Sequence, residues 1–193
     1  MIMDGAIKVL VLAIIYVIAF FAVECLGFLH PFGWTYSAVF LAVVAAWPYF
    51  KLCQRFPMPC VAILCAVLLL MCNFLIGQGH EYFAIGCVGL GCLAEVLRKV
   101  LGNYRGRNGV IASYAVMSLI PFSMSIVLWL DYDTAMQLFI NRMGDIYAAV
   151  MGRMLSKYML LAMIILTLIL AVLTMWILTR NWRPREEYHI IRE

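Results

Sequence analysis

Charged side chains are scarce in this sequence, because Asp, Glu, Lys and Arg together make up only 12% of its 193 residues. In soluble globular proteins these four types account for about a quarter of all residues. Hydrophobic residues account for 66% of the chain, and its mean hydropathy is +1.00. This composition excludes an ordinary soluble domain and predicts an all-α integral membrane protein.

Recognisable catalytic motifs are also missing. The chain contains no GxSxG, no HExxH and no phosphate-binding GxxxxGK[ST] sequence, so no known site for acyl transfer, metal-dependent hydrolysis or ATP hydrolysis can be assigned. Glu186, Glu187 and His189 stand close together, but they belong to a charged tail after the last apolar segment, and a solvated tail explains them. We therefore expect no enzyme activity, no cofactor and no metal site.

None of the seven cysteines belongs to a CxxC pair. Cys53 lies in a predicted turn, and the other six lie in apolar runs, at Cys25, Cys60, Cys65, Cys72, Cys87 and Cys92. Unpaired cysteine behaves as a small hydrophobic residue. This spacing favours packing over a disulfide or a metal site.

Residues 93–130, LAEVLRKVLGNYRGRNGVIASYAVMSLIPFSMSIVLWL, orient the whole chain. No charge occurs from Val110 to Leu130, a length that suffices for an α-helix to cross a hydrocarbon core of about 30 Å. Cations beside a span are retained on the cytoplasmic side. We therefore predict a cytoplasmic turn that carries Arg98, Lys99, Arg105 and Arg107.

The hydropathy pattern predicts a single transmembrane domain, residues 1–193, with six spans. Their predicted bounds are residues 6–28, 31–50, 56–76, 82–101, 109–131 and 158–179. The fourth span contains Glu95, which Arg98 and Lys99 can neutralise from one turn further along a helix. Gly86, Gly89 and Gly91 in the same span would let neighbouring helices approach closely.

Of the 14 Lys and Arg residues, all but Arg142, Arg153 and Lys157 fall at the N-terminus or in the three segments that this topology places inside. Asp131, Asp133 and Asp145 neutralise those three exceptions in the same outer segment. The positive-inside rule therefore predicts that both termini are cytoplasmic.

The outer segment between the fifth and sixth spans, residues 133–156, has apolar side chains at helical spacing and polar side chains between them. We expect an amphipathic helix, or two helices that are broken at Gly144. Such a segment either covers the outer end of the bundle as a lid or rests at the lipid interface. The sequence favours neither.

Polar and aromatic residues gather at the predicted outer level. Acidic residues within a span are costly and usually face the bundle interior, so Glu24 is the first candidate for contact with a ligand. An interfacial belt of Trp and Tyr is the alternative explanation for the aromatic residues. The residues predicted to bind a small molecule are Glu24, Trp34, Tyr36, His80, Glu81 and Arg142.

Several of these motifs together resemble a known family. They are the LAEVLRK end of the fourth span, the basic turn GNYRGRNG, the following ASYAVMSLIPF, the outer NRMGDIYAAVMGRM segment and the long final apolar helix. This pattern is similar to the Trep_Strep family of membrane proteins, which resemble S components of energy-coupling factor (ECF) transporters. The resemblance implies a bacterial cytoplasmic (inner) membrane location and an outer site for a vitamin, a metal or a related nutrient.

The resemblance also implies partners, namely one transmembrane T component and two cytoplasmic ABC ATPases. S components commonly dock through an AxxxA pattern on the first helix, but here Ala6, Ala13, Ala19 and Ala22 are not four residues apart. The candidate docking residues are Ala13, Ala19 and Gly89.

Three alternative functions remain open from the sequence. The chain could be a membrane assembly or regulatory protein that binds a protein partner, or a small secondary transporter. An intramembrane enzyme would use Glu24 or Glu81 with His30 or His80.

Cysteine labelling tests the predicted topology. In a variant without the native cysteines, single cysteines placed at Gln78 and Asn141 should react with an impermeant maleimide in intact cells. A cysteine at Asn103 should react only after the membrane is opened. Labelling at Asn103 in intact cells would show that the topology is wrong.

Overall fold

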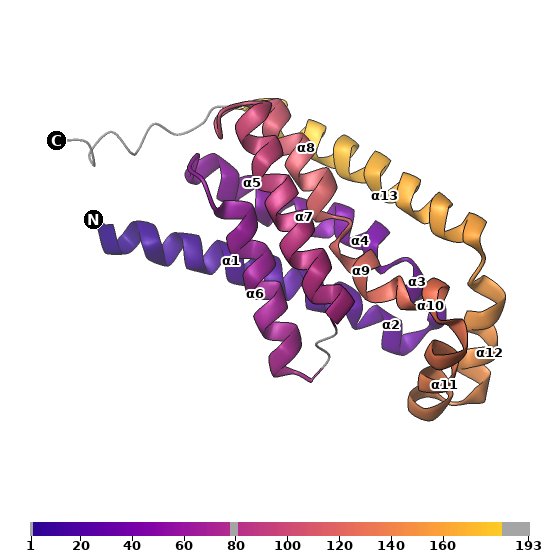
Figure 1. Ribbon diagram of the computed structural model, residues 1–193. Coiled ribbons are helices and arrows are strands. Elements are labelled where there is room, and N and C mark those ends of the chain that lie inside the picture. Colours follow the sequence, from indigo (N-terminus) through magenta and orange to yellow (C-terminus); the bar gives the residue numbers. More distant parts are fainter. Residues whose placement is uncertain (1, 78–80, 183–193) are drawn as a thin grey trace.

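The computed structural model describes residues 2–77 and 81–182, and every regular element within these ranges is a helix (Figure 1). The chain begins with α1 (Ile2–Glu24), the short α2 (Leu26–Leu29) and α3 (Pro31–Thr35). At the start of α3, Nδ1 of His30 accepts a hydrogen bond from the backbone N–H of Phe32 at 3.1 Å. This cap and Pro31 in the first turn both favour the start of a new helix at α3.

The second predicted span, residues 31–50, is not one straight helix. Its main part consists of α4 (Ser37–Val44) and α5 (Ala46–Arg55), which meet at an angle of 42°. Pro48 lies four residues after Val44, so it cannot donate to the Val44 carbonyl and its ring crowds that group. The bend at Ala45 follows from this proline.

The middle of the chain forms a helical pair. Helix α6 (Val61–Leu75) begins after Cys60, which has a left-handed backbone with φ 75°, and α7 (Glu81–Val100) runs beside it. The fifth predicted span is interrupted, because α8 (Arg107–Met117) ends four residues before Pro121 and the short α9 (Ile120–Ser125) and α10 (Val127–Leu130) follow. Pro121 thus breaks the helix where the sequence predicts a kink.

The last three helices differ in character. Two short helices, α11 (Tyr132–Met143) and α12 (Asp145–Met154), flank Gly144, whose φ of 87° suits glycine. Helix α13 (Lys157–Leu178) is long and apolar, and the Ser156 side chain caps it by accepting from the Met159 N–H at 3.1 Å.

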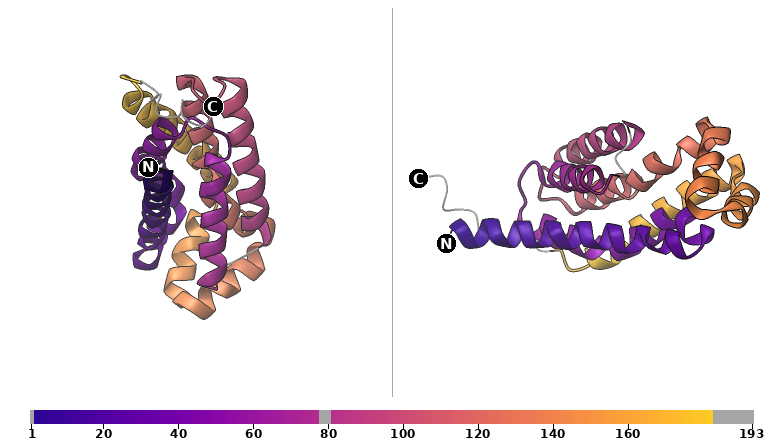
Figure 2. Two further views of the ribbon diagram at one scale, coloured as in Figure 1. Left: turned by 90° about the vertical axis from the view of Figure 1, so that its left-hand side faces the viewer. Right: turned by 90° about the horizontal axis from the view of Figure 1, so that it is seen from below.

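The helices lie in two layers (Figure 2). Helices α1, α4, α5 and α13 pack on one another in the first layer, and α6 to α9 form the second. Helices α11 and α12 lie at the end of the molecule that is remote from the start of α1 (Figure 1).

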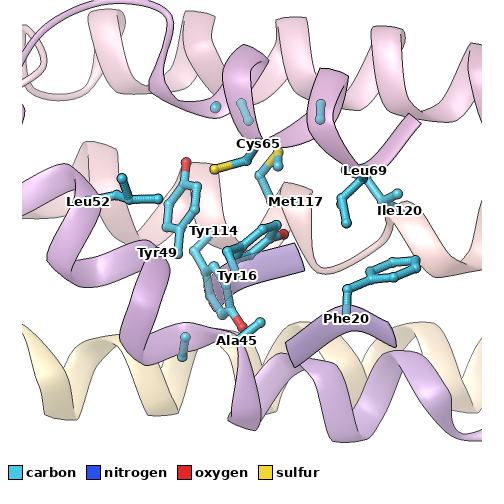
Figure 3. Close-up of a cluster of buried hydrophobic side chains, with 14 of the residues drawn as sticks. Tyr16, Phe20, Ala45, Tyr49, Leu52, Cys65, Leu69, Tyr114, Met117 and Ile120 are labelled. Atoms are coloured by element: carbon cyan, nitrogen blue, oxygen red, sulfur yellow. The ribbon is translucent and has the colours of Figure 1, made fainter. Parts of the chain in front are cut away.

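Three buried tyrosines occupy the centre between the layers (Figure 3). The Tyr49 hydroxyl donates to Oγ of Ser113 at 3.0 Å. The Tyr114 hydroxyl lies 2.9 Å from the carbonyl oxygen of Leu41 and 3.2 Å from that of Ala42, just before the bend in α4–α5. The ring of Tyr16 packs 6.0 Å from that of Tyr49. The Tyr114 hydroxyl therefore reaches the backbone carbonyls that precede the bend.

Basic residues meet at the end that is opposite to α11 and α12. The Arg107 guanidinium donates to Oγ1 of Thr179 at 3.1 Å and to the Trp176 carbonyl at 3.2 Å. Nε1 of Trp182 donates to the Arg105 carbonyl at 2.8 Å, and its ring packs on Phe50. These contacts join the α7–α8 turn, the end of α13 and α5.

By length and composition, two described segments could cross a membrane, Ile7–Leu29 and Tyr158–Leu178, and the bent pair α4–α5 could be a third. Helix α6 is apolar but has 15 residues, which corresponds to about 22 Å of α-helix and is short of a full span. The protein is thus all-helical with two to three candidate spans, and the remaining predicted spans consist of shorter or more polar helices.

The three glycines of α7 have different surroundings. A Cβ added at Gly91 would lie 2.8 Å from the Cβ of Ala66 on α6, and one added at Gly86 would overlap the Ser123 side chain on α9. At Gly89 an added Cβ would have no neighbour within 4 Å. Gly86 and Gly91 therefore permit close helix packing within the chain, whereas Gly89 faces outward.

This difference predicts opposite effects of alanine. Gly91→Ala should lower the free energy of unfolding by about 1–3 kcal/mol, because the rigid Ala66 methyl cannot move aside. Gly89→Ala, the matched control, should leave stability unchanged or raise it by up to about 1 kcal/mol, because alanine favours the helix. Thermal unfolding in detergent measures both, and equal effects would contradict the assignment of faces.

Candidate functional site

Glu24 ends α1 in an otherwise apolar stretch and is half-buried. The Ser37 side chain, at the start of α4, lies close to the carboxylate. Ser37 is itself buried. The end of α1 and the start of α4 thus bring together a polar pair, which suits a site that faces the bundle interior.

Trp34 and Tyr36 lie beside this pair at the end of α3. Trp34 packs against Gly27 of α2, and its ring meets the Phe139 ring of α11 edge-on, with centroids 5.3 Å apart and planes at 88°. Tyr36 stacks on Phe32 with centroids 4.3 Å apart, and its hydroxyl lies 3.5 Å from the sulfur of Met159 on α13. Both aromatic residues therefore have partners from distant parts of the chain.

Helices α11 and α12 close this end of the bundle over α2 and α3 (Figure 1). The Tyr147 hydroxyl donates to the Gly27 carbonyl at 2.5 Å, and the Thr35 hydroxyl lies 3.5 Å from the sulfur of Met151. Burial raises the pKa of Tyr147 above its ordinary value, so the hydroxyl stays protonated and can donate. Nε1 of Trp129 donates to the Ser156 carbonyl at 3.3 Å, which holds the start of α13.

We define the outer cluster as the hydrophobic residues that pack together at this end, most of which are aromatic or contain sulfur. Its centre is a small apolar contact between Ala135 and Met151, with the larger side chains packed around it. Its members are Trp34, Trp129, Ala135, Met136, Phe139, Tyr147, Met151 and Leu155. The cluster can offer an incoming molecule aromatic faces, sulfur atoms and, from Glu24 and Ser37 nearby, polar groups.

Not all predicted ligand residues belong to this region. Glu81 is exposed at the first position of α7, and Arg142 is exposed in the last turn of α11. His80 lies outside the described residues. Of the predicted residues, Glu24, Trp34 and Tyr36 lie on one stretch of chain, from the end of α1 to the start of α4.

Ser37, Thr35 and Tyr147 were not predicted as site residues. Tyr147 occupies an apolar position in the helical pattern of residues 133–156, and that pattern was the only available signal. Ser37 and Thr35 flank Tyr36, but the sequence does not show which group a single hydroxyl in an apolar segment will contact. The contacts that distinguish them join residues far apart in the sequence.

The candidate docking residues are placed differently from one another. Ala13 has 0% exposure, so it packs in the protein's own core, and Ala19 is partly buried against that core. Gly89 is on the surface of α7. Close to it is an apolar hollow of about 130 Å³ between α6 and α7, lined by Ile63, Ala66, Val67, Leu70, Cys87, Val88, Gly91 and Cys92.

The cysteines are all free thiols. Cys53, Cys65 and Cys87 are buried among apolar neighbours. Cys72 is partly buried against the same core, and Cys25, Cys60 and Cys92 are exposed. Packing therefore accounts for the buried and partly buried cysteines.

Comparison with known proteins supports the membrane assignment. A family model described as a hypothetical bacterial integral membrane protein (Trep_Strep) matches residues 5–181. No curated protein and no solved structure matches the chain.

The Tyr147 hydrogen bond gives a test of how α12 is held. Tyr147→Phe removes a neutral hydrogen bond worth about 1 kcal/mol, so backbone amides of α11 and α12 should exchange about fivefold faster. Hydrogen exchange read by mass spectrometry measures this effect. Tyr158→Phe is the matched control, because Tyr158 is 87% exposed. Unchanged exchange in Tyr147→Phe would mean that other contacts hold the hairpin.

Proposed function

The chain belongs to the Trep_Strep family of bacterial integral membrane proteins, and from this premise we propose that it is the substrate-binding S component of an ECF-type importer. In this proposal it captures a small nutrient (a vitamin, a metal or a related cofactor) at the outer face. The chain would then be a multi-pass protein of the cytoplasmic (inner) membrane, with six membrane-crossing segments and both termini cytoplasmic.

The separation of charge along the molecule supports this orientation. Arg105 and Arg107 meet the end of α13 at one end of the bundle, whereas the outer cluster, Glu24 and α11–α12 lie at the other. Cations near a span are retained inside. By the same rule, the outer cluster at the opposite end would face the outside of the cell, from which a nutrient would arrive.

The observation that carries the functional proposal is the α11–α12 hairpin over the outer cluster. The hairpin has its own left-handed glycine at Gly144 and meets α2 and α3 through a few specific contacts, such as Tyr147 with Gly27 and Trp34 with Phe139. A short helical hairpin that is held in this way can open without disturbing the tyrosine core. We infer that it acts as a lid over a ligand bound near Glu24.

Energy for uptake must come from partners in this proposal, because the chain contains no phosphate-binding motif. The family resemblance provides them as a T component and two cytoplasmic ABC ATPases. Coupling would pass through helix contacts in the membrane, where small residues allow close approach.

Mass spectrometry of small molecules that co-purify with the full-length protein tests the proposed site. Glu24→Ala should lower the amount of retained ligand about tenfold, because it removes a half-buried carboxylate and its hydrogen-bonding capacity. Asp145→Ala is the matched control, since Asp145 is an exposed acid at the same end.

Equal retention by wild type and Glu24→Ala would move the ligand site away from Glu24. Accumulation of substrate by the purified chain alone, driven by an ion gradient in vesicles, would instead favour a secondary transporter.

A second candidate function, a membrane assembly or regulatory protein, is favoured by the surface around Gly89. The apolar hollow beside it and the absence of any neighbour within 4 Å of an added Cβ suit the close approach of a partner helix. Gly89→Trp should reduce co-purification of a partner chain in both functions. The two functions differ in ligand retention. If the chain is a transporter subunit, the wild-type protein should retain a small molecule that the Glu24→Ala variant does not; an assembly or regulatory protein should retain none.

A further inference from the structure

Arg98 is a fully buried cation at the end of α7. Its exposure is 0%, and that of Glu95, one turn earlier, is 7%. Burial of a charge is costly unless hydrogen bonds and an opposite charge compensate for it. The groups around Arg98 therefore show which of its N–H groups have a partner and which do not.

Glu95 is the partner of only one guanidinium nitrogen, Nη1. Nη1 of Arg98 lies 3.3 Å from Oε1 of Glu95, while Oε2 accepts the backbone N–H of Ala62 on α6 at 2.9 Å. The carboxylate therefore cannot turn both oxygens toward Arg98. Among the described residues, Nε and Nη2 of Arg98 have no hydrogen-bond partner.

The two unpartnered nitrogens form one edge of the planar guanidinium. Their N–H bonds are parallel, and this geometry matches two oxygens of one carboxylate or phosphate. The other titratable groups that face Arg98 are Cys53, Tyr49 and Cys65, which are neutral thiols and a phenol. None of them presents a pair of anionic oxygens.

The α7–α8 turn covers this arginine. The Tyr104 ring lies over the guanidinium, with 5.7 Å between its centroid and Cζ, and the Tyr104 N–H donates to the Arg98 carbonyl at 3.0 Å. Asn103 and Tyr104 both have a left-handed backbone, with φ of 43° and 64°. Tyr104 is half-buried, whereas Asn103 is exposed. Tyr104 is therefore one of the side chains that shield the guanidinium from solvent.

We propose that Arg98 is a binding site for a phosphate-type anion, held by two oxygens on the Nε–Nη2 edge beneath Tyr104. The exposed cations Lys99 and Arg105 lie on either side of Tyr104 in the sequence and would attract such an anion. The phosphate could belong to an anionic lipid headgroup or be free in solution. The site lies at the opposite end of the bundle from the outer cluster and does not depend on the proposed transport function.

Thermal unfolding of the full-length protein in a neutral detergent tests the site. Inorganic phosphate, phosphatidylglycerol and, as a lipid without phosphate, diacylglycerol are each titrated, and native mass spectrometry counts the bound molecules. We expect phosphate or phosphatidylglycerol to raise the unfolding temperature, and diacylglycerol to leave it unchanged. A response to inorganic phosphate identifies a free anion, and a response to phosphatidylglycerol alone identifies a headgroup.

Two variants distinguish binding by the Nε–Nη2 edge of Arg98 from attraction by positive charge alone. Arg98→Lys keeps the charge but loses the paired donors, so the half-saturating concentration should rise about tenfold or more. Lys99→Gln is the matched control, because it removes an exposed cation next to Arg98 and should change that concentration only about twofold. A loss of affinity in Lys99→Gln as large as in Arg98→Lys would overturn the proposal.

Tyr104→Ala keeps the test decisive if Arg98→Lys does not fold. It retains Arg98 and removes the cover, so anion binding should be at least as tight as in wild type and faster. No shift of the unfolding temperature by either anion, in wild type and in Tyr104→Ala, would also overturn the proposal.

Discussion

A polar group inside a hydrocarbon layer must find its hydrogen-bond partner within the protein, since no water is available there. This constraint explains why buried hydroxyl groups of the chain bond to backbone carbonyls. The bend between α4 and α5 follows carbonyls that the Tyr114 hydroxyl reaches, and the Thr35 hydroxyl donates to the Pro31 carbonyl at 2.8 Å within α3. Both hydroxyl groups therefore have a backbone carbonyl of the chain as a partner. The hydroxyls of Tyr16 and Thr167 are exceptions, because neither has a partner among the described residues.

Much of the fold could be predicted because apolar length is visible in the sequence. The family match and the apolar helices confirm a helical membrane protein, and α13 falls within two residues of its predicted start and end. The hydropathy of residues 31–50, however, does not reveal that Pro48 bends this segment. A proline near the start of a helix is common and harmless. Its effect depends on whether the helix is already in progress, and hydropathy does not contain that information.

The direction in which each small residue faces could not be predicted, for a related reason. An apolar helix in a membrane lacks the contrast between polar and apolar faces that reveals orientation. Gly86, Gly89 and Gly91 therefore looked equivalent, yet two of them pack inside the chain and Gly89 does not. Likewise Ala13 is buried in the core. The site shows the same limit, because Glu24 stands out as a charge in a span whereas its partner Ser37 becomes apparent only when α1 and α4 are paired in space.

Spacing along the helix makes Arg98 and Lys99 equally suitable partners for Glu95, and helix packing decides between them. Arg98 and Lys99 both lie one turn beyond Glu95, but only Arg98 is buried with it, while Lys99 is exposed. The reason lies in the approach of α6 to α7 at Gly91, where a missing side chain lets Ala66 come close. Ala62 is one turn before Ala66 on α6, so the same approach brings its N–H to Glu95. That bond occupies one carboxylate oxygen and leaves a single oxygen for Arg98. The unpartnered edge of the arginine is therefore a consequence of a glycine two turns away.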